Sequence, residues 1–468
     1  MPLSILEKVE IIDVAAEGNA IAKVDNLVIF VPFVAPGDIV DIKLTRKKNR
    51  YAEATALKIH HHGEYREEPF CEHFQTCGGC RWQHLKYEKQ LHYKQKQVTD
   101  ALERTGKIIA PPMLPIIASE QTTHYRNKLE FTFSDRRWIL PHEPFDQTPE
   151  ELSALGFHIP GRFDKVLDIK QCHLQPHLSN KIRNAVKHFC NQNRIDFQNL
   201  RTHRGLMRNL IIRNSNRGEW MVTVVFGVFD NHNADRRNKL LEFITQTFPE
   251  ITSLWYVENP KPNDSINDLE PVLYSGQPYI TEQLHGMQFQ VGPKSFMQTN
   301  STQAEKLYSA VNNLAQPSNN RTIYDLYSGT GTIAAILSPN CRKVTGVEYV
   351  AEATNAARNN AAINSIHNAT FFSGDMKDIL TQSFFDQNGA PDIIVTDPPR
   401  AGMHGKVIEN ILIAAPQKII YVSCNPATQA RDIALMQQQY KVEKIQPIDM
   451  FPHTHHVESI ALLTKTDT

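Results

Sequence analysis

The chain has 468 residues, of which 41% are hydrophobic and 21% are charged, as expected of a folded globular protein. This composition excludes a disordered or collagen-like chain, and the length predicts roughly three domains. The fifty Lys and Arg residues are balanced by fifty Asp and Glu residues, so any contact with nucleic acid must rest on local basic patches.

The N-terminal segment, MPLSILEKVEIIDV, lacks the apolar core of a signal peptide, because Glu7, Lys8 and Glu10 interrupt it. No uninterrupted apolar run is long enough to span a bilayer. We therefore expect a cytoplasmic protein without a membrane partner.

Residues 5–59 alternate short β-rich runs with turns that contain Gly, Pro and Asn, a pattern typical of a small antiparallel barrel. The run from Arg46 to Tyr51 contains four cations and ends in an aromatic residue. Such a run suits phosphate contact combined with base stacking. It fits an ordinary solvated hairpin tip equally well.

Seven cysteines, unevenly spaced in a chain of this length, do not make the disulfide framework of a small secreted domain. Three of them lie close together at Cys71, Cys77 and Cys80, which indicates a metal site. Clustered cysteines of this kind hold either an iron-sulfur cluster or a structural zinc ion. The gap between Cys71 and Cys77 is wide for a zinc knuckle.

Residues 60–285 mix helical and strand patterns, and we expect them to form a central α+β domain. Leu85–Arg104 carries apolar residues at helical intervals among many polar ones, which predicts an exposed amphipathic helix. Residues 129–134 and 219–229 are predicted to be strands.

From about residue 320 onward, short apolar strands alternate with helical stretches, the pattern of a parallel α/β sheet. Four predicted strands end in or lead into an acid: Asp325, Glu348, Asp375 and Asp397. Ligands bind outside the carboxyl ends of such strands, where we expect these carboxylates to gather. An acid-rich rim suits a cationic, ribose-bearing ligand such as S-adenosylmethionine. The alternative for any single acid is that it caps the following helix.

A predicted strand at residues 418–422 leads into Ser423-Cys424-Asn425-Pro426 at the same sheet edge. Pro426 fits the first position of a helix, and Asn425 fits its cap. Cys424 would then lie beside a helix N-terminus, where the helix dipole lowers the pKa of a thiol and makes it a candidate nucleophile. Glu458, at the start of the final predicted strand, is expected to point into the same cleft. Alone, a cysteine after a strand is usually a small buried hydrophobic residue.

Three segments resemble the RNA uracil-5-methyltransferases: Asp397-Pro398-Pro399-Arg400, Ser423–Pro426 and the stretch from Phe451 to Glu458. The cysteine pattern, with Lys170-Gln171-Cys172, resembles the iron-sulfur branch of that family, and the N-terminal barrel resembles its TRAM domain. The resemblance covers nearly the whole chain. It implies a TRAM RNA-binding barrel at 1–59, a central α+β domain with a [4Fe-4S] cluster at 60–285, and a Rossmann-like methyltransferase domain that uses S-adenosylmethionine at 286–468.

The resemblance also implies roles for particular residues. Cys424 is expected to be the nucleophile and Glu458 the general base. The expected cluster ligands, in a structural role, are Cys71, Cys77, Cys80 and Cys172. Cofactor-binding positions are implied for Gln298, Tyr327, Thr332, Glu348, Asp375 and Asp397; Thr332 stands where the best-known members have an asparagine.

The expected reaction explains why a cysteine is needed. Carbon 5 of uracil is too weakly nucleophilic to take a methyl group unaided, so a thiolate adds to carbon 6 and generates an enolate that attacks the sulfonium methyl. A base must then remove the proton from carbon 5 before the cysteine can leave. The target base must first be turned out of its stack, with basic residues in the segment 125–128 as candidate helpers.

The resemblance favours 23S ribosomal RNA as the substrate of a monomeric enzyme, and transfer RNA is the alternative because both are used within the family. Three other functions are also open as interpretations of the sequence. An amino-group methyltransferase has an aromatic residue where this chain has Arg400. A radical enzyme has a C-x3-C-x2-C triplet, whereas this chain has C-x5-C-x2-C. A non-catalytic RNA-binding protein would need neither Cys424 nor Glu458.

Overall fold

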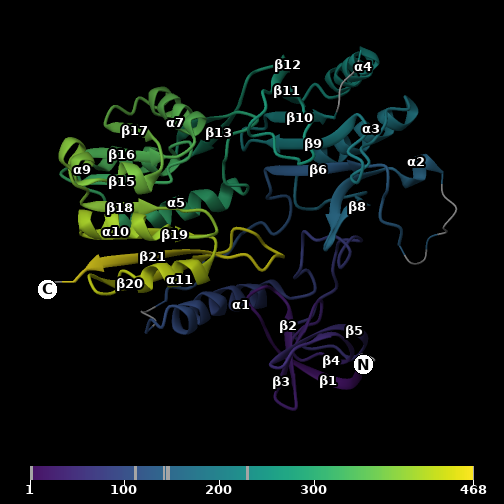
Figure 1. Ribbon diagram of the computed structural model, residues 1–468, viewed down its shortest axis with the longest axis horizontal. Coiled ribbons are helices and arrows are strands. Elements are labelled where there is room, and N and C mark those ends of the chain that lie inside the picture. The colour runs from purple at the N-terminus through teal and green to yellow at the C-terminus, as the bar shows by residue number, and fades with distance from the viewer. Residues whose placement is uncertain (1–3, 110–112, 141–142, 144–147, 228–230, 467–468) are drawn as a thin grey trace.

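Three main sheets organise the chain: an N-terminal barrel, a middle sheet and a C-terminal sheet (Figure 1). The structure is a computed structural model that describes residues 4–109, 113–140, 143, 148–227 and 231–466. Within these residues, no helix is both long enough and apolar enough to cross a bilayer.

Five strands close the barrel in the order β1-β2-β3-β5-β4: β1 (Ile5–Val14), β2 (Ala20–Val24), β3 (Leu27–Val31), β4 (Ile39–Lys47) and β5 (Tyr51–His61). Alternate residues point inward, so that Ile11, Ile29 and Ile42 are fully buried. The predicted barrel is confirmed, except that β3 and β5 pair in parallel. The parallel pair arises because β4 pairs antiparallel with both β1 and β5, which brings β5 back beside β3 in the same direction.

The middle sheet has seven strands in the order β12-β11-β10-β9-β6-β7-β8: β6 (Lys128–Ser134), β7 (Ala154–Ile159), β8 (Arg162–Asp168), β9 (Met207–Asn214), β10 (Trp220–Phe226), β11 (Ile251–Glu258) and β12 (Val272–Gly276). The central strands β9 and β10 are almost entirely buried. Helices α3 (His177–Gln192) and α4 (Asn231–Thr247) contribute Ile182, Val186 and Leu240 to the core beneath this sheet. The short helix α2 (Pro149–Leu152) precedes β7.

The C-terminal sheet has the order β17-β16-β15-β18-β19-β21-β20: β15 (Thr322–Leu326), β16 (Lys343–Glu348), β17 (Ala369–Ser373), β18 (Ile393–Thr396), β19 (Lys418–Ser423), β20 (Tyr440–Ile448) and β21 (Glu458–Lys465). β21 runs antiparallel to β19 and β20, whereas the pairs from β17 to β19 are parallel. The predicted parallel α/β sheet is therefore confirmed.

Helices cover both faces of this sheet, as in doubly wound folds. One face holds α5 (Ser301–Ala315), α6 (Thr332–Leu337) and α7 (Ala351–Ile363). The other holds α8 (Met376–Ile379), α9 (Gln382–Asn388), α10 (Gly405–Ala414) and α11 (Pro426–Ala434). A short 3-10 turn, η2 (Ser338–Asn340), follows α6, and the hairpin of β13 (Ile280–Leu284) and β14 (Met287–Val291) precedes α5. The expected domain boundary after residue 285 thus falls in the turn of that hairpin.

Helix α1 (Tyr87–Asp100), with the π-helical turn η1 (Ala101–Thr105), lies against the C-terminal sheet rather than the middle one (Figure 1). Val98 and Leu102 are fully buried there. The sequence predicted an exposed amphipathic helix, and that prediction is wrong for two polar positions, since Gln90 and Lys94 are also fully buried. Both are buried because they hold a loop of the C-terminal part by hydrogen bonds and an ion pair.

Candidate functional site

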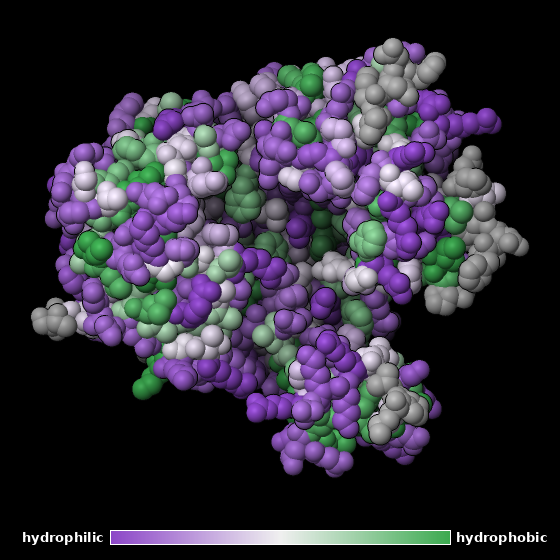
Figure 2. Space-filling model, viewed as in Figure 1, coloured by the Kyte–Doolittle hydropathy of each residue, from purple (hydrophilic) through white to green (hydrophobic). Residues whose placement is uncertain are grey.

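A cleft of about 2360 Å³ is lined by residues of the middle part and of the C-terminal part. Figure 2 shows the surface hollowed between these two parts. The residues along the cleft include Cys424 and Glu458, all four clustered cysteines and every predicted cofactor residue except Thr332.

A tight turn after β15 opens the backbone to the cleft. Tyr327, Gly329 and Gly331 all have positive φ angles, of 62°, 52° and 80°. A Cβ atom at Gly331 would lie 2.9 Å from the Cβ atom of Ala357, so only glycine fits there, whereas a Cβ atom at Gly329 would meet nothing within 4 Å. A ligand can therefore approach the backbone closely at Gly329. Tyr327 is a non-glycine residue held in the left-handed region, a strain typical of functional turns.

Glu348, the last residue of β16, is fixed at this turn by two backbone groups. The N–H group of Gly329 donates to its Oε2 atom at 3.0 Å, and the N–H group of Val350 donates to its Oε1 atom at 2.8 Å. The carboxylate retains further lone pairs toward the cleft that it lines.

Asp375 both caps a helix and lines the cleft. Its side chain accepts from the N–H group of Lys377 at 3.1 Å, at the start of α8. The ammonium group of Lys377 lies 3.0 Å from the same carboxylate and lowers the pKa of Asp375.

Asp325 is not part of the rim, and this prediction is wrong. It lies inside β15, is fully buried, and accepts from the N–H group of Ala334 in α6 at 3.0 Å. Burial raises the pKa of Asp325 to about 8. Its position one residue before the strand end turns the side chain toward the helix instead of the cleft. Asp397, directly after β18, does line the cleft, and burial raises its pKa to about 7.

Of the predicted cofactor residues Gln298 and Thr332, only Gln298 lines the cleft. Gln298 lines the cleft on the segment before α5, and its carbonyl group accepts from the side chain of Asn127 at 3.0 Å. Thr332 is buried at the start of α6, outside the cleft lining. Its hydroxyl lies 3.5 Å from that of Thr330, and Thr330 is the residue that lines the cleft. Thr330 was not singled out from the sequence.

Cys424 lies between β19 and α11, as predicted. Asn425 caps the helix by accepting from the N–H group of Ala427 at 3.1 Å, and Pro426 occupies the first helical position. The expected lowering of the thiol pKa is wrong, however. Burial, followed by the carboxylates of Glu458 and Asp397, raises the pKa of Cys424 to about 11.

Glu458 is the first residue of β21 and is 5% exposed. Burial, and then the Asp397 carboxylate, raise the pKa of Glu458 well above its ordinary value. Arg400 opposes this, and it lowers the pKa values of both Glu458 and Cys424. The carbonyl group of Arg400 accepts from Asn425 at 3.1 Å, so the segment of Arg400 is tied to the cap of α11. Arg400 is thus the cation of this acidic site, a role that sequence reasoning did not assign to it.

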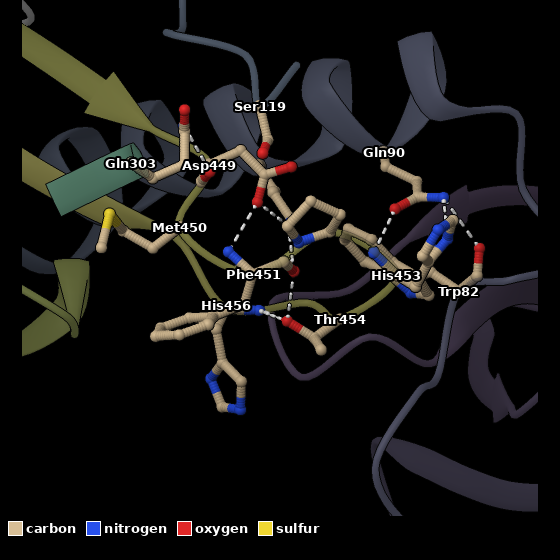
Figure 3. A network of polar contacts seen from close by, with 12 residues as sticks. Trp82, Gln90, Ser119, Gln303, Asp449, Met450, Phe451, His453, Thr454 and His456 are labelled. Carbon is tan, nitrogen blue, oxygen red and sulfur yellow. Dashed lines mark hydrogen bonds and ion pairs between the residues drawn. The ribbon is translucent and has the colours of Figure 1, made fainter. Parts of the chain in front are cut away.

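The β20–β21 loop, residues 449–457, leads directly into Glu458 and is held from distant parts of the chain (Figure 3). Lys94 and Tyr87 of α1 both donate to the carboxylate of Asp449. The side chains of Lys94 and Asp449 are completely buried. Burial lowers the pKa of Lys94, and the Asp449 carboxylate counteracts this effect.

The same loop also reaches the barrel side of the molecule. The N–H group of His453 donates to the side chain of Gln90 at 2.8 Å, and the N–H group of Trp82 donates to the carbonyl group of His453 at 3.0 Å (Figure 3). The indole of Trp82 in turn donates to the carbonyl group of Gly18 in the barrel at 2.9 Å. One loop therefore connects the barrel, α1 and the strand that carries Glu458.

The four clustered cysteines line one region of the cleft. Burial raises the pKa values of Cys77 and Cys80 to about 12, and both thiols also respond to the charges of Cys71 and Cys172. The thiols are thus neighbours, and four soft sulfur donors fit an iron-sulfur cluster or zinc. Nevertheless, across the described part of the chain no group of three or more His, Cys, Asp or Glu side chains has metal-binding geometry.

The two walls of the cleft differ in charge. Leaving histidines aside, the described lining residues up to 285 include five cations and two acids: Arg81, Arg126, Lys128, Arg162, Arg213, Glu130 and Glu270. The described lining residues from 286 onward include two cations and five acids: Lys294, Arg400, Glu348, Glu352, Asp375, Asp397 and Glu458. The arrangement suits a polyanion on the first wall and a cationic ligand on the second.

The sequence and the fold are similar to those of known proteins. Residues 273–466 match the family described as tRNA (Uracil-5-)-methyltransferase, and residues 7–57 match the TRAM domain. The chain is 54% identical to an RNA methyltransferase of Bacteroides thetaiotaomicron, covering 96% of this chain and 99% of that one. It is 51% identical to one of Porphyromonas gingivalis, covering 97% and 99%. Its fold is similar to that of the Pyrococcus abyssi tRNA (uracil-54, C5)-methyltransferase in complex with S-adenosyl-L-homocysteine, with a TM-score of 0.74 and 27% identity over 98% of this chain and 100% of that chain.

Proposed function

Because the chain belongs to the RNA uracil-5-methyltransferase family and is an enzyme that uses S-adenosylmethionine, we propose that it methylates carbon 5 of one uridine through a covalent bond to Cys424. The observation that carries this proposal is the meeting of Cys424, Glu458 and Asp397 in one cleft, where both acids raise the pKa of Cys424 and Asp397 raises that of Glu458.

In the proposed reaction, the Cys424 sulfur bonds to carbon 6 of uracil, and the electron pair of the 5,6 double bond moves toward the carbonyl oxygen at carbon 4. S-adenosylmethionine supplies a methyl group on a cationic sulfur. Carbon 5 takes this methyl group as the methyl–sulfur bond breaks, its electron pair stays on sulfur and S-adenosylhomocysteine is left. Glu458 then removes the proton from carbon 5. The freed electron pair restores the double bond as the Cys424 sulfur leaves. Arg400 favours the anionic forms of Cys424 and Glu458 that these steps require.

The acidic wall is the proposed cofactor site. Glu348 is proposed to accept from ribose hydroxyls, because its carboxylate is already oriented by Gly329 and Val350. Asp375, Asp397, Gln298 and Tyr327 complete the proposed set, and each lines the cleft. Thr332 is proposed to act indirectly, through the hydroxyl of Thr330.

We propose 23S ribosomal RNA as the substrate, with the phosphates on the cationic wall and the barrel as a second contact. The combination of a TRAM barrel with the four cysteines favours this choice. Transfer RNA is the second candidate, which the likeness to a tRNA (uracil-54, C5)-methyltransferase supports. A monomer acting in the cytoplasm would suffice, since one chain contributes every residue of the proposed site.

The four cysteines are proposed to hold a [4Fe-4S] cluster with a structural role. Gln83 accepts from the N–H group of Cys71 at 3.2 Å, and Asn180 of α3 accepts from the N–H group of Cys172 at 2.8 Å. These contacts fix the backbone on both sides of the site. The proposed division of the chain is an RNA-binding barrel at 1–59, a cluster-bearing central domain at 60–285 and a methyltransferase domain at 286–468.

Mass-spectrometric mapping of 5-methyluridine in RNA from a strain lacking this protein tests the function. One modified uridine in 23S ribosomal RNA should disappear, and should return with the wild-type chain but not with Cys424→Ala. Loss from transfer RNA instead would select the second candidate. Unchanged 5-methyluridine in both RNAs would reject the proposed reaction.

A further inference from the structure

The turn between β7 and β8 presents an arginine and a phenylalanine to the cleft. Arg162 and Phe163 begin β8, both are exposed, and both line the cleft. Phe163 is 71% exposed. Figure 1 shows β8 at the edge of the middle sheet. A single exposed phenylalanine is ordinary on a protein surface, so the surroundings decide whether this one has a role.

The base of this hairpin is firmly fixed. Asp164, the residue after Phe163, is buried, and the guanidinium group of Arg201 donates to its carboxylate at 2.7 Å. Beneath the turn, Cys77 and Cys172 pack with the apolar residues Ile159, Leu167 and Ile169. The exposed ring of Phe163 is therefore presented on an ordered support.

The segment between β14 and α5 carries a second exposed ring. Phe296 is 68% exposed and lines the cleft, two residues before Gln298. Lys294 lines the cleft next to it. Aromatic rings and cations thus occur together at two places along the cleft, which is the combination that binds single-stranded nucleic acid.

We propose that Phe163 stacks on a nucleobase adjacent to the target uridine and that Arg162 contacts a phosphate of the same segment. This inference rests on the proposed function, because the target uridine defines where the neighbour lies. The cationic wall that carries the hairpin selects a polyanion as the occupant. A base within a double helix has no free face for stacking, so the substrate is an unpaired RNA segment in which a neighbour of the uridine is also turned out.

Fluorescence anisotropy with a labelled RNA oligonucleotide that spans the mapped uridine tests the stacking contact in the full-length protein. Phe163→Ala should raise the Kd roughly 5- to 150-fold, the factor typical of losing one stacked base. Phe163→Tyr should bind like the wild type. The matched control is Tyr274→Ala, because Tyr274 is 38% exposed on β12 of the same sheet and lies outside the cleft lining. Equal affinity of Phe163→Ala and wild type would overturn the proposal.

Abasic substitutions at each neighbour of the uridine identify the partner base. At one position, the abasic site should weaken binding to the wild type but have no further effect on Phe163→Ala. Additive losses at every position would overturn stacking. Arg162→Ala should reduce the slope of log Kd against log salt by about 1, as loss of one phosphate contact requires. An unchanged slope would overturn the phosphate contact.

Two further measurements separate this inference from the proposed function. S-adenosylhomocysteine affinity should be equal in Phe163→Ala and wild type, which shows an intact fold. A 5-fluorouridine oligonucleotide should form a covalent adduct with the wild type. If the adduct forms and Phe163→Ala binds RNA normally, only the hairpin inference fails; if the wild type forms no adduct, the proposed function fails.

Discussion

At the scale of single residues, the feature that most distinguishes the site is a thiol surrounded by acids. Burial and the carboxylates of Glu458 and Asp397 raise the pKa of Cys424 to about 11. The thiolate is therefore a minor species at neutral pH. The sulfur becomes reactive when positive charge enters the site or negative charge leaves it. A cationic cofactor near Asp397 would have this effect, which would delay thiolate formation until the cofactor is bound.

Asp397→Asn should therefore make Cys424 react faster with iodoacetamide, several-fold at pH 8, where a carboxyl with a pKa of about 7 is mostly charged. At pH 6 the two proteins should differ less, because Asp397 is then largely protonated. Peptide mass spectrometry measures alkylation of Cys424 separately from the other thiols. Asp375→Asn is the control, since Asp375 lines the same cleft but is absent from the causes of the Cys424 shift. A slower reaction in Asp397→Asn would contradict the electrostatic account.

Cys424→Ala and Glu458→Gln should fail at different steps. Cys424→Ala should form no bond to RNA, because no sulfur remains to add to carbon 6. Glu458→Gln should methylate the uridine and then remain attached, because the base that removes the proton from carbon 5 is lost. Denaturing gels with labelled RNA would resolve the adduct as a retarded band. The control is Cys341→Ala, which replaces a buried cysteine outside the cleft and should behave like the wild type. An active Cys424→Ala enzyme would refute the covalent mechanism.

Glu348→Ala should weaken S-adenosylmethionine binding by about 1–3 kcal/mol, the usual cost of unpaired polar partners. The N–H groups of Gly329 and Val350 would also lose their acceptor. Calorimetry measures the affinity, and RNA affinity should stay unchanged. Glu352→Ala is the control, because Glu352 is an acid of the same wall in the first turn of α7. Equal losses in the two variants would remove Glu348 from the proposed ribose contact.

At the scale of elements, local pattern predicted the strands and helix caps well, but it did not predict which way a side chain points within them. The sequence pattern identified the strand ends that bring Glu348, Asp397 and Cys424 to one sheet edge. It failed for Asp325, because one step along a strand reverses the direction of the side chain. It also failed for Lys94, since nothing near a lysine in α1 reveals a partner in a loop more than three hundred residues away.

Breaking the ion pair between α1 and the β20–β21 loop should lower the free energy of unfolding substantially. Lys94→Met leaves the Asp449 carboxylate buried without its cation, which typically destabilises a protein by about 3–5 kcal/mol. Urea unfolding measures the loss, and the double variant Lys94→Met with Asp449→Asn should recover part of it. Lys96→Met is the matched control, because its ion pairs are partly exposed and should contribute less than about 1 kcal/mol. Similar losses for the two lysine variants would show that burial of the pair is not the cause.

At the scale of the whole molecule, the site is assembled from parts that are far apart in the sequence. The proposed catalytic pair lies at the C-terminal sheet, the cationic wall belongs to the middle part, and the β20–β21 loop is tied to α1 and, through Trp82, to the barrel. Such long-range contacts could not be predicted from one sequence, because periodicity reports only on the local environment of each element. Cys172 was linked to the cysteines at 71–80 by the family resemblance rather than by periodicity, and the structure places all four along the same cleft.

The proposed cluster can be tested as a connection between these parts. Cys71, Cys77 and Cys80 lie on the segment that joins the barrel to α1, whereas Cys172 follows β8 of the middle sheet, so bound iron would join two regions of the chain. Anaerobically purified protein should be brown and contain iron and sulfide, and Cys172→Ala should lose both and unfold at lower urea concentration. The control is Cys190→Ala, which replaces a buried cysteine of α3 and should retain the iron. Colourless protein with one zinc ion per chain, and metal content unchanged in Cys172→Ala, would show that the cysteines serve a different site.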